Sequence, residues 1–155
     1  MFRYAGAALV TGLVAAAWIV ILPPSPVSQP IAFPHAKHQG VGCTVCHSGA
    51  ATTARAGIPN TALCAKCHAT IPGRAATAAA TEPIAWVQVT QLPTHVMFSH
   101  RRHVTLGKLD CESCHGKMKD RTAPLGVAPI RIEMKTCLSC HSREGAAEDC
   151  AACHR

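Results

Sequence analysis

The hydrophobic pattern divides the chain into two unequal parts. Residues 4–22 are 19 consecutive uncharged and mostly apolar residues, enough for a helix that crosses a lipid bilayer. Arg3 precedes this run, two prolines follow it, and Trp18 lies near its far end, where interfacial aromatic residues are common. We therefore predict an N-terminal transmembrane anchor over residues 1–22, with a cytoplasmic N-terminus. A cleaved secretory signal is the alternative, but signal cores are shorter and no clear small-x-small cleavage site follows the run.

The remainder of the chain predicts little regular secondary structure. Residues 23–30 are rich in proline and form a tether. Residues 75–82 are rich in alanine and threonine and are followed by a proline, which favours a linker, although the alanines leave a short helix open. We predict a mostly irregular fold with short α-helices, exported from the cytoplasm under either interpretation of the N-terminus.

The pattern Cys-x-x-Cys-His occurs five times and uses all 10 cysteines. It is the attachment signature of c-type haem: two thiols add to the haem vinyl groups, and the histidine becomes an axial ligand of the iron. Zinc half-sites and redox disulfides also use Cys-x-x-Cys, but neither needs the adjacent histidine. We predict five covalently attached haem c groups. In chain order they occupy site 1 (Cys43, Cys46, His47), site 2 (Cys64, Cys67, His68), site 3 (Cys111, Cys114, His115), site 4 (Cys137, Cys140, His141) and site 5 (Cys150, Cys153, His154).

Five histidines remain outside the motifs, one for each predicted haem. A second histidine ligand makes a haem iron six-coordinate, so the economical interpretation is five bis-histidine haems. Met97, Met118 and Met134 are alternative ligands, but we expect them to be filler or surface residues. The predicted second, or distal, ligands are His35, His38, His95, His100 and His103.

An internal repeat organises these histidines. The pattern Phe-x-His-x-x-His begins at Phe33, before site 1, and again at Phe98, before site 3. Residues three apart on a helical turn lie on neighbouring faces, so the two imidazoles of one repeat can reach two different irons. We predict a two-haem module over residues 31–72, a linker over residues 73–94 and a three-haem module over residues 95–155.

Composition adds two constraints. The exported part is too short to form an ordinary apolar core around five cofactors, so the haem faces must serve as the core, and we expect the chain to be unfolded without haem.

The formal charge of +7 and the pI of 9.1 describe the bare polypeptide. Ten ionised propionates would bring the charge to roughly +2 with ferric irons and roughly −3 with ferrous irons. A nucleic-acid partner is therefore not expected.

These elements resemble those of the class III multihaem c-type cytochromes. In that family the first histidine of Phe-x-His-x-x-His binds the haem that follows it, and the second binds a later haem. The resemblance implies that His35 is the distal ligand of site 1 and that His100 is the distal ligand of site 3. It assigns His38 and His103 to later haems.

Two longer stretches are similar to the pentahaem subunit of alternative complex III and related quinol-oxidising complexes. They are residues 55–60, which run into site 2, and residues 86–98. The order of anchor, two-haem module, linker and three-haem module is also similar, although this chain is shorter and has Thr90 where relatives often carry a histidine. The usual three-haem unit has a distal histidine between its first two haem sites. Residues 116–136 contain none, so His95 is expected to take this role.

The sequence thus predicts a membrane-anchored pentahaem cytochrome that passes electrons along bis-histidine haems and is not itself an enzyme. The resemblance implies a subunit of a respiratory or photosynthetic quinol-oxidising complex, single-pass in the bacterial cytoplasmic membrane, with its haems on the periplasmic side. It implies iron–sulfur or quinol-oxidising subunits as donor and a cytochrome c or terminal oxidase as acceptor. The alternatives are a multihaem quinol dehydrogenase and a periplasmic multihaem reductase. A reductase needs an open iron position, which a distal histidine at every site does not leave.

Overall fold

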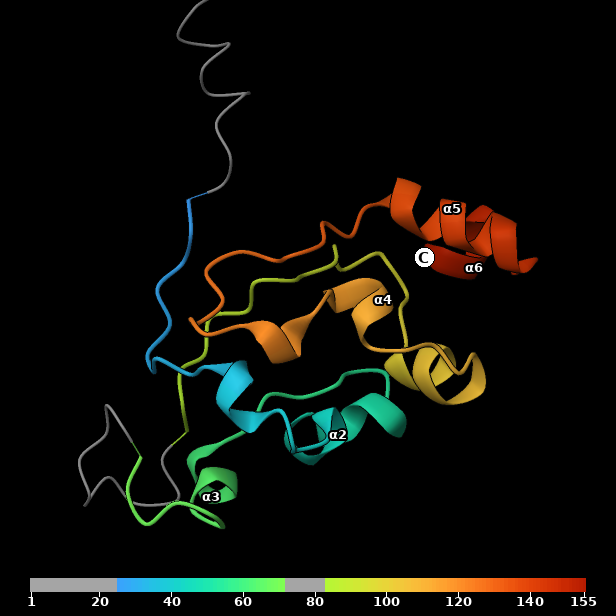
Figure 1. Cartoon of the computed structure of the whole chain (residues 1–155). Helices are drawn as coiled ribbons and strands as arrows, with labels where there is room; N and C mark the ends of the chain where they lie inside the picture. Colours follow the sequence, from blue (N-terminus) through green and yellow to red (C-terminus); the bar gives the residue numbers. More distant parts are fainter. Residues whose placement is uncertain (1–24, 72–82) are drawn as a thin grey trace, which may run out of the picture.

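The computed structural model describes residues 25–71 and 83–155 (Figure 1). In this part of the chain the backbone is mostly irregular and forms no strand; a single isolated bridge pairs Val96 with His154. The predicted fold of short helices joined by loops is confirmed. The helices and helical turns are η1 His35–His38, α2 Cys43–Cys46, η2 Ser48–Ala51, α3 Thr61–Cys64, η3 Arg102–Leu106, α4 Glu112–His115, η4 Met118–Asp120, α5 Met134–Glu144 and α6 Cys150–Cys153.

The predicted membrane anchor over residues 1–22 lies outside the described residues. Among the helices within residues 25–71 and 83–155, none has the length and apolar character needed to cross a membrane. The predicted linker is described only from residue 83 onward. There Trp86 donates from its indole nitrogen to the Pro59 carbonyl oxygen at 2.8 Å, so the two stretches that carry the resemblance to quinol-oxidising complexes contact each other.

Helix termini are set by capping residues. Asn60 and Asp149 precede α3 and α6, and their side chains accept backbone N–H bonds at 3.1 and 3.0 Å. The longest helix, α5, begins with a capping box between Glu133 and Thr136 and ends at Gly145, whose φ of 65° is the left-handed conformation that glycine adopts easily. These caps place the helices that carry sites 2, 4 and 5.

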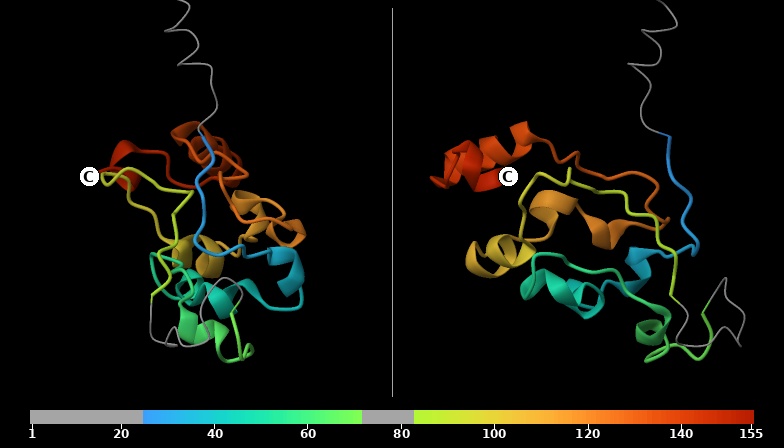
Figure 2. Two further views of the ribbon diagram at one scale, coloured as in Figure 1. Left: turned by 90° about the vertical axis from the view of Figure 1, so that its left-hand side faces the viewer. Right: turned by 180° about the vertical axis from the view of Figure 1, so that it is seen from behind.

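The helices follow one another across an elongated body (Figures 1 and 2). In each view α3 lies at one end, α5 and α6 lie together at the opposite end, and α2 and α4 lie between them. Since α4 follows α2 in space while α3 lies beyond α2, the spatial order of the helices departs from their order along the chain.

Hydrogen bonds join the segments that the sequence divided into modules. Thr105 in η3 donates from its hydroxyl to the Ala51 carbonyl oxygen at 2.6 Å, and the Arg101 N–H donates to the Thr53 carbonyl oxygen at 3.0 Å. On another side, η1 packs against η4, and the Ala36 N–H donates to a main-chain carbonyl just beyond η4 at 2.8 Å. The parts around sites 1 and 3 are therefore directly connected.

The first described segment crosses the loop between η4 and α5. Val27 N–H donates to the Gly126 carbonyl oxygen at 2.8 Å, and the Gln29 side-chain amide donates to the Leu125 carbonyl oxygen at 2.9 Å. A Cβ atom at Gly126 would lie 2.8 Å from the Pro26 Cβ atom. Only glycine permits this close approach without a shift of the backbone.

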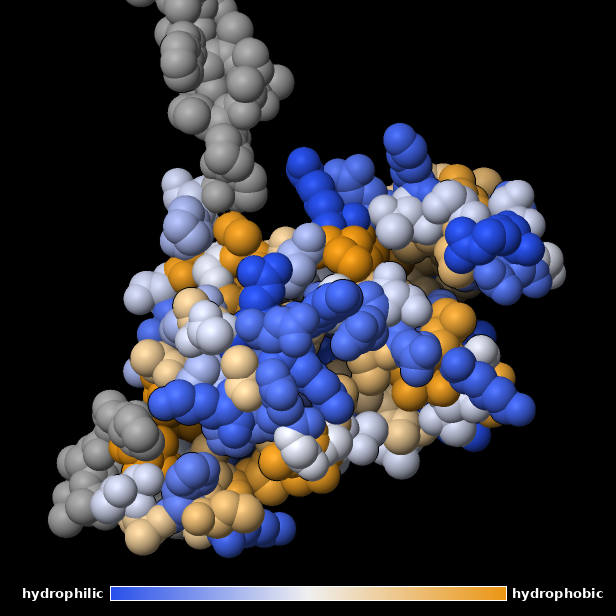
Figure 3. Space-filling model, viewed as in Figure 1, coloured by the Kyte–Doolittle hydropathy of each residue, from blue (hydrophilic) through white to orange (hydrophobic). Residues whose placement is uncertain are grey.

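The described part of the polypeptide buries very few side chains. Val45 between the site 1 cysteines is 54% exposed, Leu106 in η3 is 62% exposed and Met134 in α5 is 60% exposed. Apolar patches lie between polar side chains on the face in Figure 3. The buried side chains of the described residues are Ile31, Ala50, Ile84 and Thr61. A chain of this size needs far more burial than this to fold, so the apolar surface must be covered by bound groups.

Candidate functional site

Each of the five motifs forms about one helical turn. Sites 1, 3 and 5 lie on or beside α2, α4 and α6, site 4 lies within α5, and site 2 starts at the last residue of α3. In sites 1, 2, 3 and 5 the N–H of the motif histidine donates to the carbonyl oxygen of the first motif cysteine, at 2.8, 3.0, 2.9 and 2.8 Å. One turn brings the first cysteine, the second cysteine and the histidine to the same side. None of the ten cysteines forms a disulfide.

The Phe-x-His-x-x-His repeat has the same geometry in both copies. The Phe33 ring lies 4.9 Å from His35 at an interplanar angle of 89° and 4.5 Å from His38 at 24°. The copy that begins at Phe98 gives 4.9 Å and 88°, then 4.5 Å and 24°. Each phenylalanine therefore fixes two imidazoles, and these rings point to different partners.

Four of the free histidines face the histidines of four motifs. Their partners belong to sites 2, 3, 4 and 5, and each free histidine faces one motif histidine. The ring-centre distances are 6.0 Å for His38–His68, 6.3 Å for His100–His115, 6.2 Å for His103–His141 and 5.4 Å for His95–His154.

The fifth free histidine lies near the site 1 motif. Burial lowers the pKa of His35, and the neighbouring His47 and His38 lower it further. Because His38 faces site 2, His47 of site 1 is left as the partner of His35. Four of the motif histidines thus face a free histidine, and the fifth, His47, lies near His35. Within residues 25–71 and 83–155, no three histidine, cysteine or acidic side chains are grouped as they would be around a zinc ion.

The pair distances fit haem iron with two axial imidazoles. An imidazole nitrogen lies about 2 Å from a bound metal ion, so two imidazoles on opposite sides of one ion have ring centres about 6 Å apart. The pairs of sites 2, 3 and 4 lie at 6.0, 6.3 and 6.2 Å. The site 5 pair, at 5.4 Å, departs most from this spacing. In every site the paired thiols of the same turn could hold the haem edge.

Main-chain carbonyls set the orientation of five of the ten rings. The Nδ1 atoms lie 2.6–3.2 Å from carbonyl oxygens of Pro34, Gly57, Ala54, Ser99 and Ala147. A carbonyl only accepts, so Nδ1 carries the hydrogen and the opposite nitrogen, Nε2, is left to bind a metal. The rings held this way are His38, His47, His100, His103 and His141.

His35 differs from its repeat counterpart. His100 donates from Nδ1 to the Ala54 carbonyl oxygen at 3.1 Å, whereas the Nδ1 atom of His35 is buried and has no hydrogen-bond partner in the part of the chain that the structure describes. Both rings share the edge contact with the phenylalanine of their repeat, so His35 lacks only the carbonyl partner.

Two family models match adjacent parts of the chain. The model "Class III cytochrome C family" matches residues 21–85, which include sites 1 and 2. The model "Cytochrome c7 and related cytochrome c" matches residues 96–155, which include sites 3, 4 and 5. Together the two models match most of the chain, whose two parts are similar to the class III and the cytochrome c7-type multihaem cytochromes. These families imply covalently bound haem c, and the expected class III resemblance is confirmed.

The chain is also similar to a named relative over most of the length of both sequences. This multihaem cytochrome is similar to "Menaquinone reductase, multiheme cytochrome c subunit" of Nitratidesulfovibrio vulgaris, strain Hildenborough. The two are 28% identical over 161 aligned positions, which cover 82% of this chain and 77% of the relative.

Thiols of sites 1 and 2 lie close together in the cytochrome. Burial raises the pKa of the Cys46 thiol, and the nearby Cys64, Cys43 and Cys67 thiols raise it further. Two of these three neighbours belong to site 2. The attachment points of sites 1 and 2 are therefore adjacent.

The remaining sites of the cytochrome are adjacent in the same way. Burial raises the pKa of Cys111, and the Cys43 thiol of site 1 raises it further through charge and a hydrogen bond. Burial raises the pKa of Cys114, and the two site 4 thiols raise it further. Burial also raises the pKa of Cys137, and the Cys153 thiol of site 5 is the next cause. Site 3 thus adjoins sites 1 and 4, and site 4 adjoins site 5.

The three methionines considered as ligands lie elsewhere in the fold. Met97 is exposed and donates its backbone N–H to the Cys153 carbonyl oxygen at 2.7 Å. Met134 begins α5 and is exposed, and Met118 begins η4. Since four motif histidines face a free histidine and His47 lies near His35, these positions agree with the expected filler or surface role.

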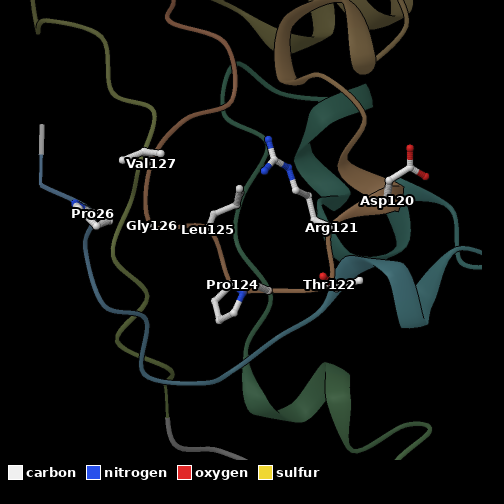
Figure 4. Close-up of a pocket in the computed structure, with 9 residues that line it drawn as sticks. Pro26, Asp120, Arg121, Thr122, Pro124, Leu125, Gly126 and Val127 are labelled. Carbon is white, nitrogen blue, oxygen red and sulfur yellow. The ribbon is translucent and has the colours of Figure 1, made fainter. Parts of the chain in front are cut away.

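A cavity of about 350 Å³ lies where the tether crosses the loop before α5 (Figure 4). Pro26 lines one side and residues 120–127 line the other. Figure 4 shows Arg121 and Asp120 pointing in different directions, so these two side chains do not form a joint polar site.

The carbonyl groups that orient the rings were not predicted from the sequence. Two of them, Pro34 and Ser99, lie four residues before the histidines that they hold, so the repeat itself could have indicated them. Gly57, Ala54 and Ala147 give no such signal, because every residue type carries a carbonyl group.

Proposed function

We propose that this cytochrome is a pentahaem electron-transfer subunit of a membrane complex that reacts with quinones. The observation that supports the proposal is the arrangement of the histidines: four free histidines each face a motif histidine, and the fifth, His35, lies near His47. We further propose that residues 1–22 anchor the chain in the bacterial cytoplasmic membrane and that the paired histidines lie on the periplasmic side.

The residues of the chain have separate roles at each site. The two thiols would attach the haem, and the two imidazoles would be the protein ligands of its iron. When bound, haem c supplies one-electron redox chemistry. Carbonyl groups hold the rings of His38, His47, His100, His103 and His141 in place and increase their basicity as ligands. With two histidines available at each site, no ligand position on the iron would be left for a substrate, which favours a carrier over a multihaem reductase.

The partners follow from similarity. The sequence resembles the pentahaem subunit of quinol-oxidising complexes, and the relative from Nitratidesulfovibrio vulgaris is named as a subunit of a menaquinone reductase. Both resemblances support a quinone-reactive complex, but they indicate opposite directions of electron flow. A carrier has no intrinsic direction, so the potentials of the partners decide it. If the complex oxidises quinol, an iron–sulfur subunit is the electron donor and a cytochrome c or terminal oxidase is the electron acceptor.

Purification of the native complex in mild detergent tests this proposal. We expect a quinone-reactive subunit to copurify with the cytochrome, and we expect menaquinol to reduce the haems only in the intact complex. The isolated chain should contain five haems by mass spectrometry and pyridine haemochrome absorbance, all low-spin by EPR. An isolated chain with a high-spin ferric haem that reduces a small substrate on its own would instead establish the multihaem reductase.

A further inference from the structure

Each Phe-x-His-x-x-His turn connects two sites. In η1, His35 lies near His47 of site 1, and His38 faces His68 of site 2. The stacked and edge contacts of Phe33 hold both rings on this one turn. The second copy does the same for sites 3 and 4, with His100 and His103. Sites 1 and 2 are therefore neighbours, and so are sites 3 and 4.

A single loop connects site 1 to site 3. His47 of site 1 donates from Nδ1 to the Gly57 carbonyl oxygen at 2.8 Å, and His100 of site 3 donates from Nδ1 to the Ala54 carbonyl oxygen at 3.1 Å. These two carbonyl groups lie three residues apart in the same loop. The His100 N–H also donates to the Ala54 carbonyl oxygen at 3.1 Å. One short loop thus orients a ring of site 1 and a ring of site 3, which makes these sites neighbours across the two modules.

Site 5 adjoins site 4 at the far end of the molecule. His141 of site 4 donates from Nδ1 to the Ala147 carbonyl oxygen at 2.6 Å, in the short loop that leads from α5 to α6. α6 carries site 5 and lies beside α5 in all views of Figures 1 and 2. The opposite end of the body holds α3, which leads into site 2.

We propose that the five sites form one line in the order 2–1–3–4–5, and that electrons enter and leave the cytochrome at sites 2 and 5. This order rests on the proposed electron-transfer function. The adjacent thiols of sites 2 and 1, 1 and 3, 3 and 4, and 4 and 5 support it. Site 1, the first in the sequence, is then an internal relay between the modules. A transfer between neighbours oxidises one iron and reduces the next, with no bond formed or broken.

The test is NMR spectroscopy of the full-length ferric protein in detergent, labelled with ¹³C and ¹⁵N. Paramagnetically shifted haem methyl signals are assigned to sites through their contacts with protons of the protein. We expect nuclear Overhauser effects between haems of sites 1 and 3, and none between haems of sites 2 and 3. Effects that link sites 2 and 3 directly, with none between sites 1 and 3, would overturn the order.

A matched pair of variants gives an independent measurement. His38→Met and His103→Met change the same position of the two repeats, and a methionine ligand raises the haem potential. His38 faces site 2, which has one neighbour in the proposed order, so His38→Met should shift the haem signals of one other site. His103 faces site 4, which has two neighbours, so His103→Met should shift the haem signals of two other sites. The opposite result overturns the order. Fewer than five haem signal sets in the parent protein would overturn the pentahaem function together with the order, whereas five sets with different links overturn the order alone.

Discussion

The site 5 pair offers the sharpest test of the histidine pairing. His95 lies 5.4 Å from His154 between ring centres, the shortest of the measured pairs, and it lies one residue before the segment matched by the cytochrome c7 model. Its assignment therefore depends on the structure rather than on the family match. We predict that His95→Ala removes one axial ligand and opens the iron of site 5 only.

The magnitude follows from the count of pairs. One of five irons loses a ligand, so one fifth of the low-spin haem signal should be lost. The backbone around the substitution should persist. The Arg155 N–H donates to the His95 carbonyl oxygen at 3.1 Å, and the Met97 N–H donates to the Cys153 carbonyl oxygen at 2.7 Å. Such bonds each contribute about 1 kcal/mol and do not involve the deleted ring.

Carbon monoxide binding to the ferrous protein is the assay. The parent protein should bind none, and His95→Ala should bind one molecule per chain. His103→Ala, which opens site 4, should give the same stoichiometry and serves as a control. Met97 lies two residues from His95, so the double variant His95→Ala/Met97→Ala checks whether it replaces the lost ligand. If both the single and the double variant keep five low-spin haems, His95 is not a ligand and the pairing with His154 is wrong.

Three further predictions follow. Without haem attachment the chain should give the circular dichroism of an unfolded protein, because the described residues bury so few apolar side chains; a cooperative thermal transition of the haem-free chain would contradict this. Gly126→Ala should lower the free energy of unfolding by about 1–3 kcal/mol, because its Cβ would meet Pro26 at 2.8 Å. Gly40→Ala, whose Cβ would have no neighbour within 4 Å, is the control and should change it far less in denaturant titrations. N-terminal sequencing of the mature protein should find a chain that begins before Leu22, and a start beyond that residue would indicate a cleaved signal.

Local features could be predicted from the sequence, and long-range ones could not. The motif turns depend on hydrogen bonds between residues four apart, so Cys-x-x-Cys-His already contains the arrangement of its thiols and ring. The two repeats likewise place their phenylalanine and histidine rings by local geometry, with nearly equal distances in both copies. Counting free histidines identified His95 as a candidate ligand, although the sequence did not indicate that it faces site 5 rather than site 3 or 4.

The contacts between distant segments had no signal in the residue types. Gln29 donates to the Leu125 carbonyl oxygen across 96 positions of the chain, and Ala54 accepts from the His100 ring across 46. Both use main-chain oxygens, which are the same in every residue. The predicted linker gave no indication that Trp86 binds Pro59. For these reasons the sequence predicted two modules but not how site 1 adjoins site 3.

The contact between Val27 and Gly126 has a consequence for the order of haem attachment and folding. If the chain is exported from its N-terminus, Val27 cannot bind Gly126 until the residues after site 3 have also crossed the membrane. During that interval sites 1 and 2 belong to an open chain, whose thiols are accessible to an attachment enzyme. Closing so long a loop costs conformational entropy, which the few buried apolar side chains offset poorly. The contact between Val27 and Gly126 should therefore form late, after the haems are attached, and stabilise the complete holoprotein.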